Sequence, residues 1–387
     1  MLVLASVIIA VTPELNKSFP KVMWIVINLL WYFEVFLFEH HQVKFAAKTF
    51  AFGILFWIIY ETVLSIIGFS SASIGNYHIQ FCFFDLLIKA LYAKQFYSTK
   101  QKSFLFRAIQ LVVIINVIQN IYISNLFPNI QNAIYQHPEV GDGLNIAMTE
   151  FYNMLAFFIG VNFLAFYIEE KMVWKVFDIS AIVLCYYFML TCTTRATSLT
   201  MSVVLLVSVW YLHKLGYRKV SPGPIVCLIV LFCFLSYFMD DIINMLPDRV
   251  AVRYMTLAGD SGGDTATLSR FELIGNSIRT FFANPVFGIG YHLGNDYFSL
   301  VGQHSLITDY LAWFGIFGAI FLIFFFRSLY RLLPKGCNSI FLTRYSRYLI
   351  LVFCIYSVLS NTFRPENSVS AFLMLSCLSC TKAEHKK

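Results

Sequence analysis

His304 is the residue in this sequence best suited to general-base chemistry. It lies in Gly302-Gln-His-Ser-Leu-Ile-Thr-Asp309, where a long polar segment meets an apolar run. A neutral imidazole can accept a proton from a hydroxyl group near neutral pH, a step worth roughly 10²–10⁴-fold in rate. Asp309 follows five residues later and either orients the imidazole or caps the next helix. We therefore take His304 as the candidate catalytic residue and Asp309 as a supporting one.

Arginine side chains near the same polar segment could bind an anion. Arg195 lies in Thr191-Cys-Thr-Thr-Arg-Ala-Thr197, between two apolar runs, where threonine hydroxyls could complete a polar pocket. Arg270 and Arg279 lie nine residues apart on a predicted amphipathic helix, so they project about 180° apart. Guanidinium groups bind phosphate or carboxylate in a bidentate manner. We expect Arg195, Arg270 and Arg279 to bind such a group, with Arg270 favoured over Arg279.

The composition requires that lipid solvates much of the protein surface. Hydrophobic residues make up 59% of the 387 residues and charged residues only 13%, about half the usual charged share of a soluble chain. In a bilayer only helices or closed barrels satisfy every backbone polar group. Uninterrupted apolar runs such as Val22–Phe38 lack the alternation of barrel strands. The sequence predicts an all-α polytopic membrane protein.

Runs of about 20 apolar residues predict about 12 transmembrane helices. The predicted spans are 1–12, 22–39, 48–68, 77–97, 104–125, 147–168, 174–192, 196–213, 223–243, 304–326, 345–362 and 365–381. The alternating loops place nineteen of the 28 Lys and Arg residues on one side, eight on the other, and Lys89 within a span. By the positive-inside rule the richer side is cytoplasmic. Both termini are then predicted to be cytoplasmic.

This orientation places a long polar segment, 244–303, outside the cytoplasm. It contains a predicted amphipathic helix over Thr267–Phe282, which Asn284-Pro285 should end, and Gly288 and Gly290, which allow a tight return to the membrane. The expected domains are a transmembrane bundle over 1–243, an extracytoplasmic loop over 244–303, and C-terminal spans with a cytoplasmic tail over 304–387. Beyond Lys21, every basic residue on this outer side is arginine. Arg253 and Arg364 are therefore supporting candidates.

The sequence lacks the signature motifs of several functional classes. The sequence has no phosphate-binding G-x-x-x-x-G-K-[ST] motif and no H-E-x-x-H zinc motif. No outer acidic cluster has metal-ligand spacing, so we expect neither a metal nor a cofactor. The net charge of +7 reflects membrane topology rather than nucleic-acid binding. A series of acidic residues in or beside the spans (Glu34, Glu61, Glu150 and Asp178) keeps a proton-coupled transporter as an alternative.

Five motifs follow one another between residues 185 and 325. They are the Thr-rich helix end with Arg195, the loop opening with Ser269-Arg270, Asn284-Pro-x-x-Gly-x-Gly290, Gly302-x-His-Ser305 and Asp309-Tyr-Leu-Ala-x-x-Gly-x-x-Gly318. Their order resembles the O-antigen ligase and Wzy-type polysaccharide polymerase superfamily, with its GT-C-like membrane fold. The resemblance implies metal-independent, inverting glycosyl transfer from an undecaprenyl-pyrophosphate-linked glycan. It also implies that Arg195 and Arg270 bind the pyrophosphate and that His304 activates the acceptor hydroxyl.

One departure from the ligase branch favours a polymerase. Ligases carry a second His shortly before the motif His and an Asn after it, whereas this chain has Val301 and Ser305. We expect a polymerase that joins lipid-linked repeat units into O-antigen, capsular polysaccharide or exopolysaccharide at the outer face of a bacterial cytoplasmic (inner) membrane. The expected partners are undecaprenyl-pyrophosphate-linked glycans, membrane lipids and a chain-length regulator protein. The alternatives are an O-antigen ligase that transfers glycan to lipid A core or protein, and a flippase or another transporter of lipid-linked glycans.

Overall fold

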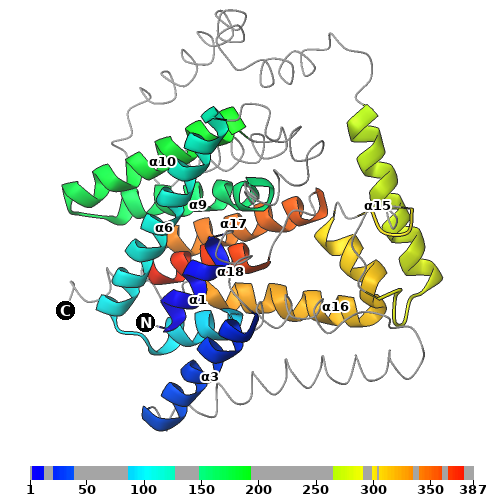
Figure 1. Cartoon of the computed structure of the whole chain (residues 1–387), viewed down its shortest axis with the longest axis horizontal. Coiled ribbons are helices and arrows are strands. Elements are labelled where there is room, and N and C mark those ends of the chain that lie inside the picture. Colours follow the sequence, from blue (N-terminus) through cyan, green and yellow to red (C-terminus); the bar gives the residue numbers. More distant parts are fainter. Residues whose placement is uncertain are drawn as a thin grey trace, which may run out of the picture. The chain divides into compact units, whose positions relative to one another are not determined.

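The computed structural model describes nine stretches of the chain (Figure 1). These stretches are residues 2–12, 21–38, 86–126, 148–192, 265–290, 299–302, 305–333, 340–359 and 365–378. Within them the regular secondary structure is α-helical, without a β-strand, which confirms the predicted all-helical class. The chain divides into two compact units, residues 1–113 with 267–387, and residues 114–266.

The first unit is built from apolar helices of both chain ends. Helix α1 (Leu2–Val11) packs against α3 (Lys21–Phe38) and α18 (Pro365–Leu378), and α16 (Leu306–Leu332) packs against α17 (Ile340–Leu359) and α18. Aromatic rings join these helices. Phe353 of α17 lies with its ring centroid 5.3 Å from that of Phe372 in α18 and 6.2 Å from that of Phe325 in α16. A further helix spans residues 86–96 and contacts α3 through Tyr92 and Trp31, whose ring centroids are 5.3 Å apart.

Helix α6 (Thr99–Leu126) begins five residues before the predicted span at 104. Its first turn is stabilised by a reciprocal capping box. The backbone N–H of Ser98 donates to Gln101 Oε1 (2.8 Å), and the backbone N–H of Gln101 donates to Ser98 Oγ (3.4 Å). Two otherwise unpaired donors are satisfied in this way, so the helix extends into the polar sequence ahead of the apolar run.

The second unit contains an antiparallel pair of helices, α9 (Met148–Ile168) and α10 (Met172–Cys192), which pack against each other. Helix α10 has two distinct faces. Asp178, Ala181, Cys185 and Phe188 recur every three or four residues and are buried, whereas Val176, Ile179, Val183 and Tyr187 are exposed. A helix that exposes apolar side chains on one face and buries an aspartate on the other is typical of a bundle surrounded by lipid, since only the inner face can accommodate the polar group.

Helices are present in each predicted span that the structure describes, with differences of several residues at some ends. Residues 99–119 of α6 and all of α16 are long and apolar enough to cross a membrane. The predicted spans 48–68, 196–213 and 223–243 lie outside the described residues. Apolar helices of this kind indicate a membrane protein. The count of twelve spans, the three-part domain division and the inside–outside orientation stay predictions.

Helix α16 extends six residues beyond its predicted end at 326, through two arginines. Arg327 and Arg331 are exposed, while Leu329 and Leu332 between and after them are buried, so the amphipathic pattern continues where hydropathy falls. The Nζ of Lys94 donates hydrogen bonds to the backbone carbonyls of Arg331 and Leu333 at the end of this helix. A lysine at this position satisfies terminal carbonyls and complements the helix dipole.

Candidate functional site

Helix α16 is broken at Gly315, and the preceding loop supplies the missing hydrogen bonds. Gly315 adopts φ 56° and ψ −135° inside an otherwise continuous helix. The N–H of Ile316 donates to the carbonyl of Pro285 (2.9 Å), and the N–H groups of Ile289 and Gly290 donate to the carbonyls of Ala312 (3.1 Å) and Trp313 (2.9 Å). Because hydrocarbon offers no hydrogen-bond partners, an interrupted helix in a membrane requires such protein partners.

Two glycines make this close approach between the loop and the helix possible. Gly288 has φ 67°, and a Cβ added there would lie 2.3 Å from the carbonyl oxygen of Trp313. A Cβ added at Gly315 would lie 2.5 Å from the carbonyl oxygen of Val286. Both positions therefore require a residue without a Cβ. The predicted helix end at Asn284-Pro285 is confirmed, since α15 ends at Ala283, and Gly288 and Gly290 both have positive φ. The return to the membrane after them stays a prediction.

Helix α15 (Thr265–Ala283) confirms the amphipathic helix predicted over 267–282 and presents one buried face to the start of α16. Ser277 and Thr280 are buried, whereas Ile278, Arg279 and Phe282 are exposed. Thr280 Oγ1 donates to the carbonyl of Leu300 (2.6 Å). Thr280 therefore binds α15 to residues 299–302, which precede α16.

A buried hydrogen-bond network joins α15, the segment around residue 302 and the first turn of α16. Ser277 Oγ donates to Asp309 Oδ1 (2.6 Å) and accepts from the backbone N–H of Gly302 (2.9 Å). Asp309 Oδ2 accepts from the backbone N–H of Ser305 (2.9 Å). Ser277, Ser305 and Asp309 are each 0% exposed. The polar atoms of this network are paired with one another, as buried polar groups require.

Asp309 thus takes part in capping α16, one of the two roles that its position in the sequence predicted. Ser305 is the N-cap residue, and its side chain accepts from the backbone N–H of Thr308 (3.2 Å), while Asp309 binds the N–H of Ser305 in return. An acidic residue in the first turn also complements the helix dipole.

The structure locates only some of the residues predicted to form the site. The backbone of Arg270 lies in α15, seven residues before Ser277 and therefore within about 20° of the same helical face. Arg279 is exposed and lies two residues after Ser277, about 200° around the helix. The remaining candidates, Arg195, Arg253, His304 and Arg364, lie outside the described residues, as does the side chain of Arg270.

Ser277 is a residue of the site that the sequence did not reveal. Its spacing of seven from Arg270 placed both on one face of an amphipathic helix, and that spacing was visible in the sequence. Its partner Asp309 lies 32 residues away, however, and no local pattern connects them. Across the described part of the chain, no group of three His, Cys, Asp or Glu residues could bind a metal ion.

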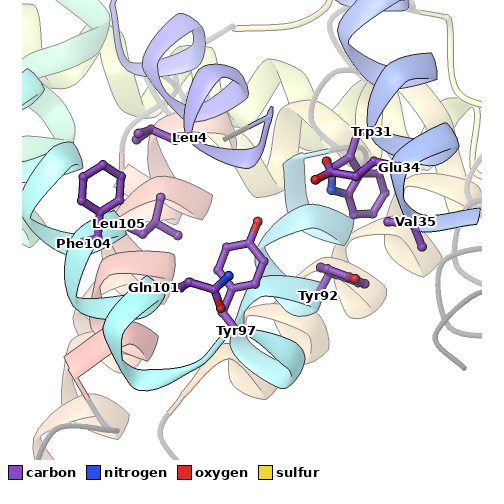
Figure 2. A pocket seen from close by; sticks show the side chains of 9 residues that line it. All are labelled: Leu4, Trp31, Glu34, Val35, Tyr92, Tyr97, Gln101, Phe104 and Leu105. Carbon is purple, nitrogen blue, oxygen red and sulfur yellow. The ribbon is translucent and has the colours of Figure 1, made fainter. Parts of the chain in front are cut away.

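A separate pocket of about 260 Å³ lies among α1, α3, the 86–96 helix and α6 (Figure 2). Trp31 and Glu34 line one side and Gln101 and Phe104 the other, and Figure 2 shows the Tyr97 hydroxyl directed into the space between them. The residues that line this pocket are Leu4, Trp31, Glu34, Val35, Tyr92, Tyr97, Gln101, Phe104 and Leu105. None of them belongs to α15 or α16, so this pocket is distinct from the network around Asp309.

Within the bundle, Lys89 is fully buried. Its Nζ donates to Ser6 Oγ (2.8 Å) and lies 5.6 Å from the centroid of the Trp31 ring. These contacts fit the structural role expected of a charged residue inside an apolar span, which needs polar or aromatic partners to offset its desolvation.

Comparison with known proteins supports the resemblance seen in the motifs. The family model described as O-antigen ligase (Wzy_C) matches residues 179–323. The matched segment contains Arg195, Arg270, Arg279, His304 and Asp309. No curated protein matches the chain. The chain therefore carries, over residues 179–323, a domain of the O-antigen ligase family, as its motifs predicted.

Proposed function

We propose that this protein is a membrane glycosyltransferase that polymerises undecaprenyl-pyrophosphate-linked oligosaccharide repeat units at the outer face of the cytoplasmic membrane. The O-antigen ligase domain supports action on lipid-linked glycans. The proposed site combines His304 as general base with Arg195 and Arg270 as the pyrophosphate-binding residues. Arg279 is exposed on the opposite face of α15 and takes at most an outer position.

The observation that carries this proposal is the contact between α15 and the segment before His304. At Gly302 an added Cβ would lie 2.2 Å from the carbonyl oxygen of Leu273, so the two backbones touch. Arg270 precedes Leu273 by three residues, about 4.5 Å along the helix axis. His304 follows Gly302 by two residues, at most about 7 Å of extended chain. A long guanidinium side chain and an imidazole at these positions can reach one substrate.

The proposed reaction is a single displacement at the anomeric carbon of the donor sugar. The acceptor hydroxyl oxygen forms the new glycosidic bond, His304 takes the hydroxyl proton, and the bond to the pyrophosphate oxygen breaks with its electron pair. Undecaprenyl pyrophosphate leaves with the added negative charge, which the arginines stabilise. Attack opposite the leaving group inverts the anomeric configuration. No metal is needed in this scheme, because guanidinium groups supply the positive charge.

The role of Ser305 in the structure weakens the use of this residue to distinguish a polymerase from a ligase. Ligases carry Asn after the motif His, and here the corresponding Ser305 is the N-cap of α16. Asn and Ser are about equally good N-cap residues, so this exchange preserves the cap and discriminates little between the two activities. The absence of a second histidine at Val301, which is fully buried, is the remaining difference. An O-antigen ligase is therefore the nearest alternative.

A polymer-ladder assay tests the proposal. Cells carrying His304→Ala or Arg270→Ala should lose the ladder of polymerised glycan while single repeat units are still transferred to the final acceptor. Arg347→Ala is the matched control, because Arg347 is an exposed arginine of α17. Loss of every transferred glycan would identify a ligase instead. Normal ladders in both variants, at normal protein levels, would refute the proposed mechanism.

A flippase or another transporter of lipid-linked glycan is the alternative from a different class. A broken transmembrane helix is a feature of many transporters, where its half-helix ends surround a polar site at the membrane centre. Here the residues next to the break at Gly315 in the sequence are apolar, namely Ala312, Trp313, Phe314 and Ile316. Loss of a flippase would retain repeat units on the inner leaflet, whereas loss of a polymerase leaves them accessible outside the cell membrane.

A further inference from the structure

Two side chains bind the backbone on either side of Gln303-His304, at Gly302 and at Ser305. Ser277 Oγ accepts from the backbone N–H of Gly302, the residue before the dipeptide. Asp309 Oδ2 accepts from the backbone N–H of Ser305, the residue after it. Ser277 and Asp309 are joined by the 2.6 Å hydrogen bond from Ser277 Oγ to Asp309 Oδ1. The two anchoring points are therefore held by a single, continuous hydrogen-bonded unit.

Capping of α16 alone does not require this arrangement. The Ser305 side chain already caps the helix by accepting from Thr308 N–H. In a usual capping box the acidic or amide side chain is three residues after the cap, whereas Asp309 is four residues after Ser305. Its second oxygen is directed to a serine on a different helix. The network therefore connects α15, which carries Arg270, with the backbone on either side of His304.

Because the network is buried, each of its polar atoms needs a hydrogen-bond partner within the protein. Ser277, Ser305 and Asp309 are 0% exposed, and burial of a carboxylate is unfavourable unless hydrogen bonds compensate for the lost water. Hydrogen bonds to an ionised group are also shorter and stronger than neutral ones. Such bonds restrain the backbone at Gly302 and at Ser305.

We propose that Ser277 and Asp309 are positioning residues for His304. They hold the backbone on either side of it and, through α15, set its place relative to Arg270. This inference rests on the proposed function, because it assigns to the network the task of orienting the general base. Misplacement of a reacting group by about 1 Å costs on the order of 10²-fold in rate.

Two substitutions probe the two anchors. Ser277→Ala removes the acceptor for Gly302 N–H and the donor to Asp309 Oδ1. Asp309→Asn keeps the size of the side chain but leaves only one acceptor oxygen for two donors. A base that is poorly positioned should reduce kcat by about 10–100-fold while KM changes by less than about threefold, because substrate binding is untouched.

Thr280→Val provides the matched control. Thr280 lies on the same face of α15, is buried, and bonds the carbonyl of Leu300 in the same segment. It does not bond to either residue that flanks the dipeptide in the contacts of this network. Thr280→Val should lower the apparent melting temperature about as much as Ser277→Ala does, yet leave kcat within about threefold of the wild type.

The experiment combines kinetics with amide hydrogen exchange on the full-length protein in lipid nanodiscs. Synthetic undecaprenyl-pyrophosphate-linked repeat units serve as substrate. Exchange at the amides of Gly302 and Ser305 is expected to accelerate at least about tenfold in Ser277→Ala and Asp309→Asn respectively, and to stay unchanged at both in Thr280→Val. That exchange readout does not depend on activity and therefore tests the anchors separately from the reaction.

The outcomes separate this inference from the proposed function. Faster exchange with a selective loss of kcat supports positioning. Unchanged exchange, unchanged kcat, or an increase in KM alone, in a protein that His304→Ala inactivates, overturns the positioning role and leaves the proposed function intact. Full activity of His304→Ala overturns the proposed function, and with it the assignment of a positioning task to this network.

Discussion

Replacement of Gly315 by alanine should destabilise the protein severely. The residue has φ 56° and ψ −135°, a region that residues with a Cβ rarely occupy, and such strain costs about 1–3 kcal/mol. The new Cβ would also lie 2.5 Å from the carbonyl oxygen of Val286 and 2.7 Å from that of Pro285. Both neighbours are backbone atoms that accept hydrogen bonds from Ile316 N–H, so they cannot move away without loss of that contact.

The expected magnitude follows from these two terms. Overpacking of a well-packed site costs about 1–3 kcal/mol, which with the backbone strain gives a loss of about 2–6 kcal/mol in the free energy of unfolding. Proteins of this kind have a total stability of about 5–15 kcal/mol, so Gly315→Ala should be expressed poorly. Unfolding of the purified protein in mixed micelles, followed by circular dichroism during titration with SDS, measures the difference.

Gly275 of α15 supplies the matched control for this measurement. An added Cβ there meets no atom within 4 Å, and the residue lies in the interior of a helix. Gly275→Ala should therefore stabilise the protein by about 0.5–1 kcal/mol, since alanine is the better helix former. A Gly315→Ala protein as stable as the wild type, beside a stabilised Gly275→Ala protein, would refute the account of the helix break.

Three further experiments test separate parts of the structure. Arg270→Ala should reduce kcat/KM for the lipid-linked donor by at least about 100-fold, whereas Arg279→Ala, on the exposed face, should reduce it by less than about fivefold; equal losses would contradict the placement of the pyrophosphate. Lys89→Ala should lower the free energy of unfolding by about 1–3 kcal/mol, because the buried Ser6 Oγ loses its donor; an SDS unfolding curve like that of the wild type would contradict this role. N-ethylmaleimide should modify the half-buried Cys354 faster than the fully buried Cys185 in the folded protein, as measured by peptide mass spectrometry; the reverse order would contradict the burial of α10.

Hydropathy predicted the helices well because the physical cause is local. A run of apolar residues must be helical in lipid wherever it lies in the fold, and α3, α9, α10 and α17 begin within five residues of their predicted starts. The ends were less predictable where polar residues continue a helix. Ser98 and Gln101 extend α6 through a capping box whose spacing is visible in the sequence. Lys94 stabilises the end of α16 through a contact across 237 residues, which no local pattern contains.

The sequence suggests residues for the candidate site but not the contacts that hold its described part together. The placement of His304 after a polar segment and of Arg270 on an amphipathic helix followed from the sequence. The hydrogen bond between Asp309 and Ser277 did not follow from the sequence, because any nearby hydroxyl group could donate to the carboxylate of Asp309. Only the packing of α15 against the start of α16 selects this partner, and packing depends on side-chain shapes along both helices.

The glycine motifs that resemble the O-antigen ligase family have a structural explanation in this fold. Asn284-Pro-x-x-Gly-x-Gly290 ends α15 and then directs the N–H groups of Ile289 and Gly290 to carbonyls that the break at Gly315 leaves without helical partners. Phe287 stacks on Phe317 just beyond the break, with ring centroids 5.7 Å apart. The loop and the broken helix therefore form one unit in which each satisfies the backbone of the other. Because α15 enters this unit and α16 starts beside it, the same contacts that close the helix break also fix α15 against Ser305 and Asp309. A shift of the loop at Gly288 would move α15 relative to Ser305 and Asp309, so in the proposed mechanism the motif glycines act on the chemistry indirectly.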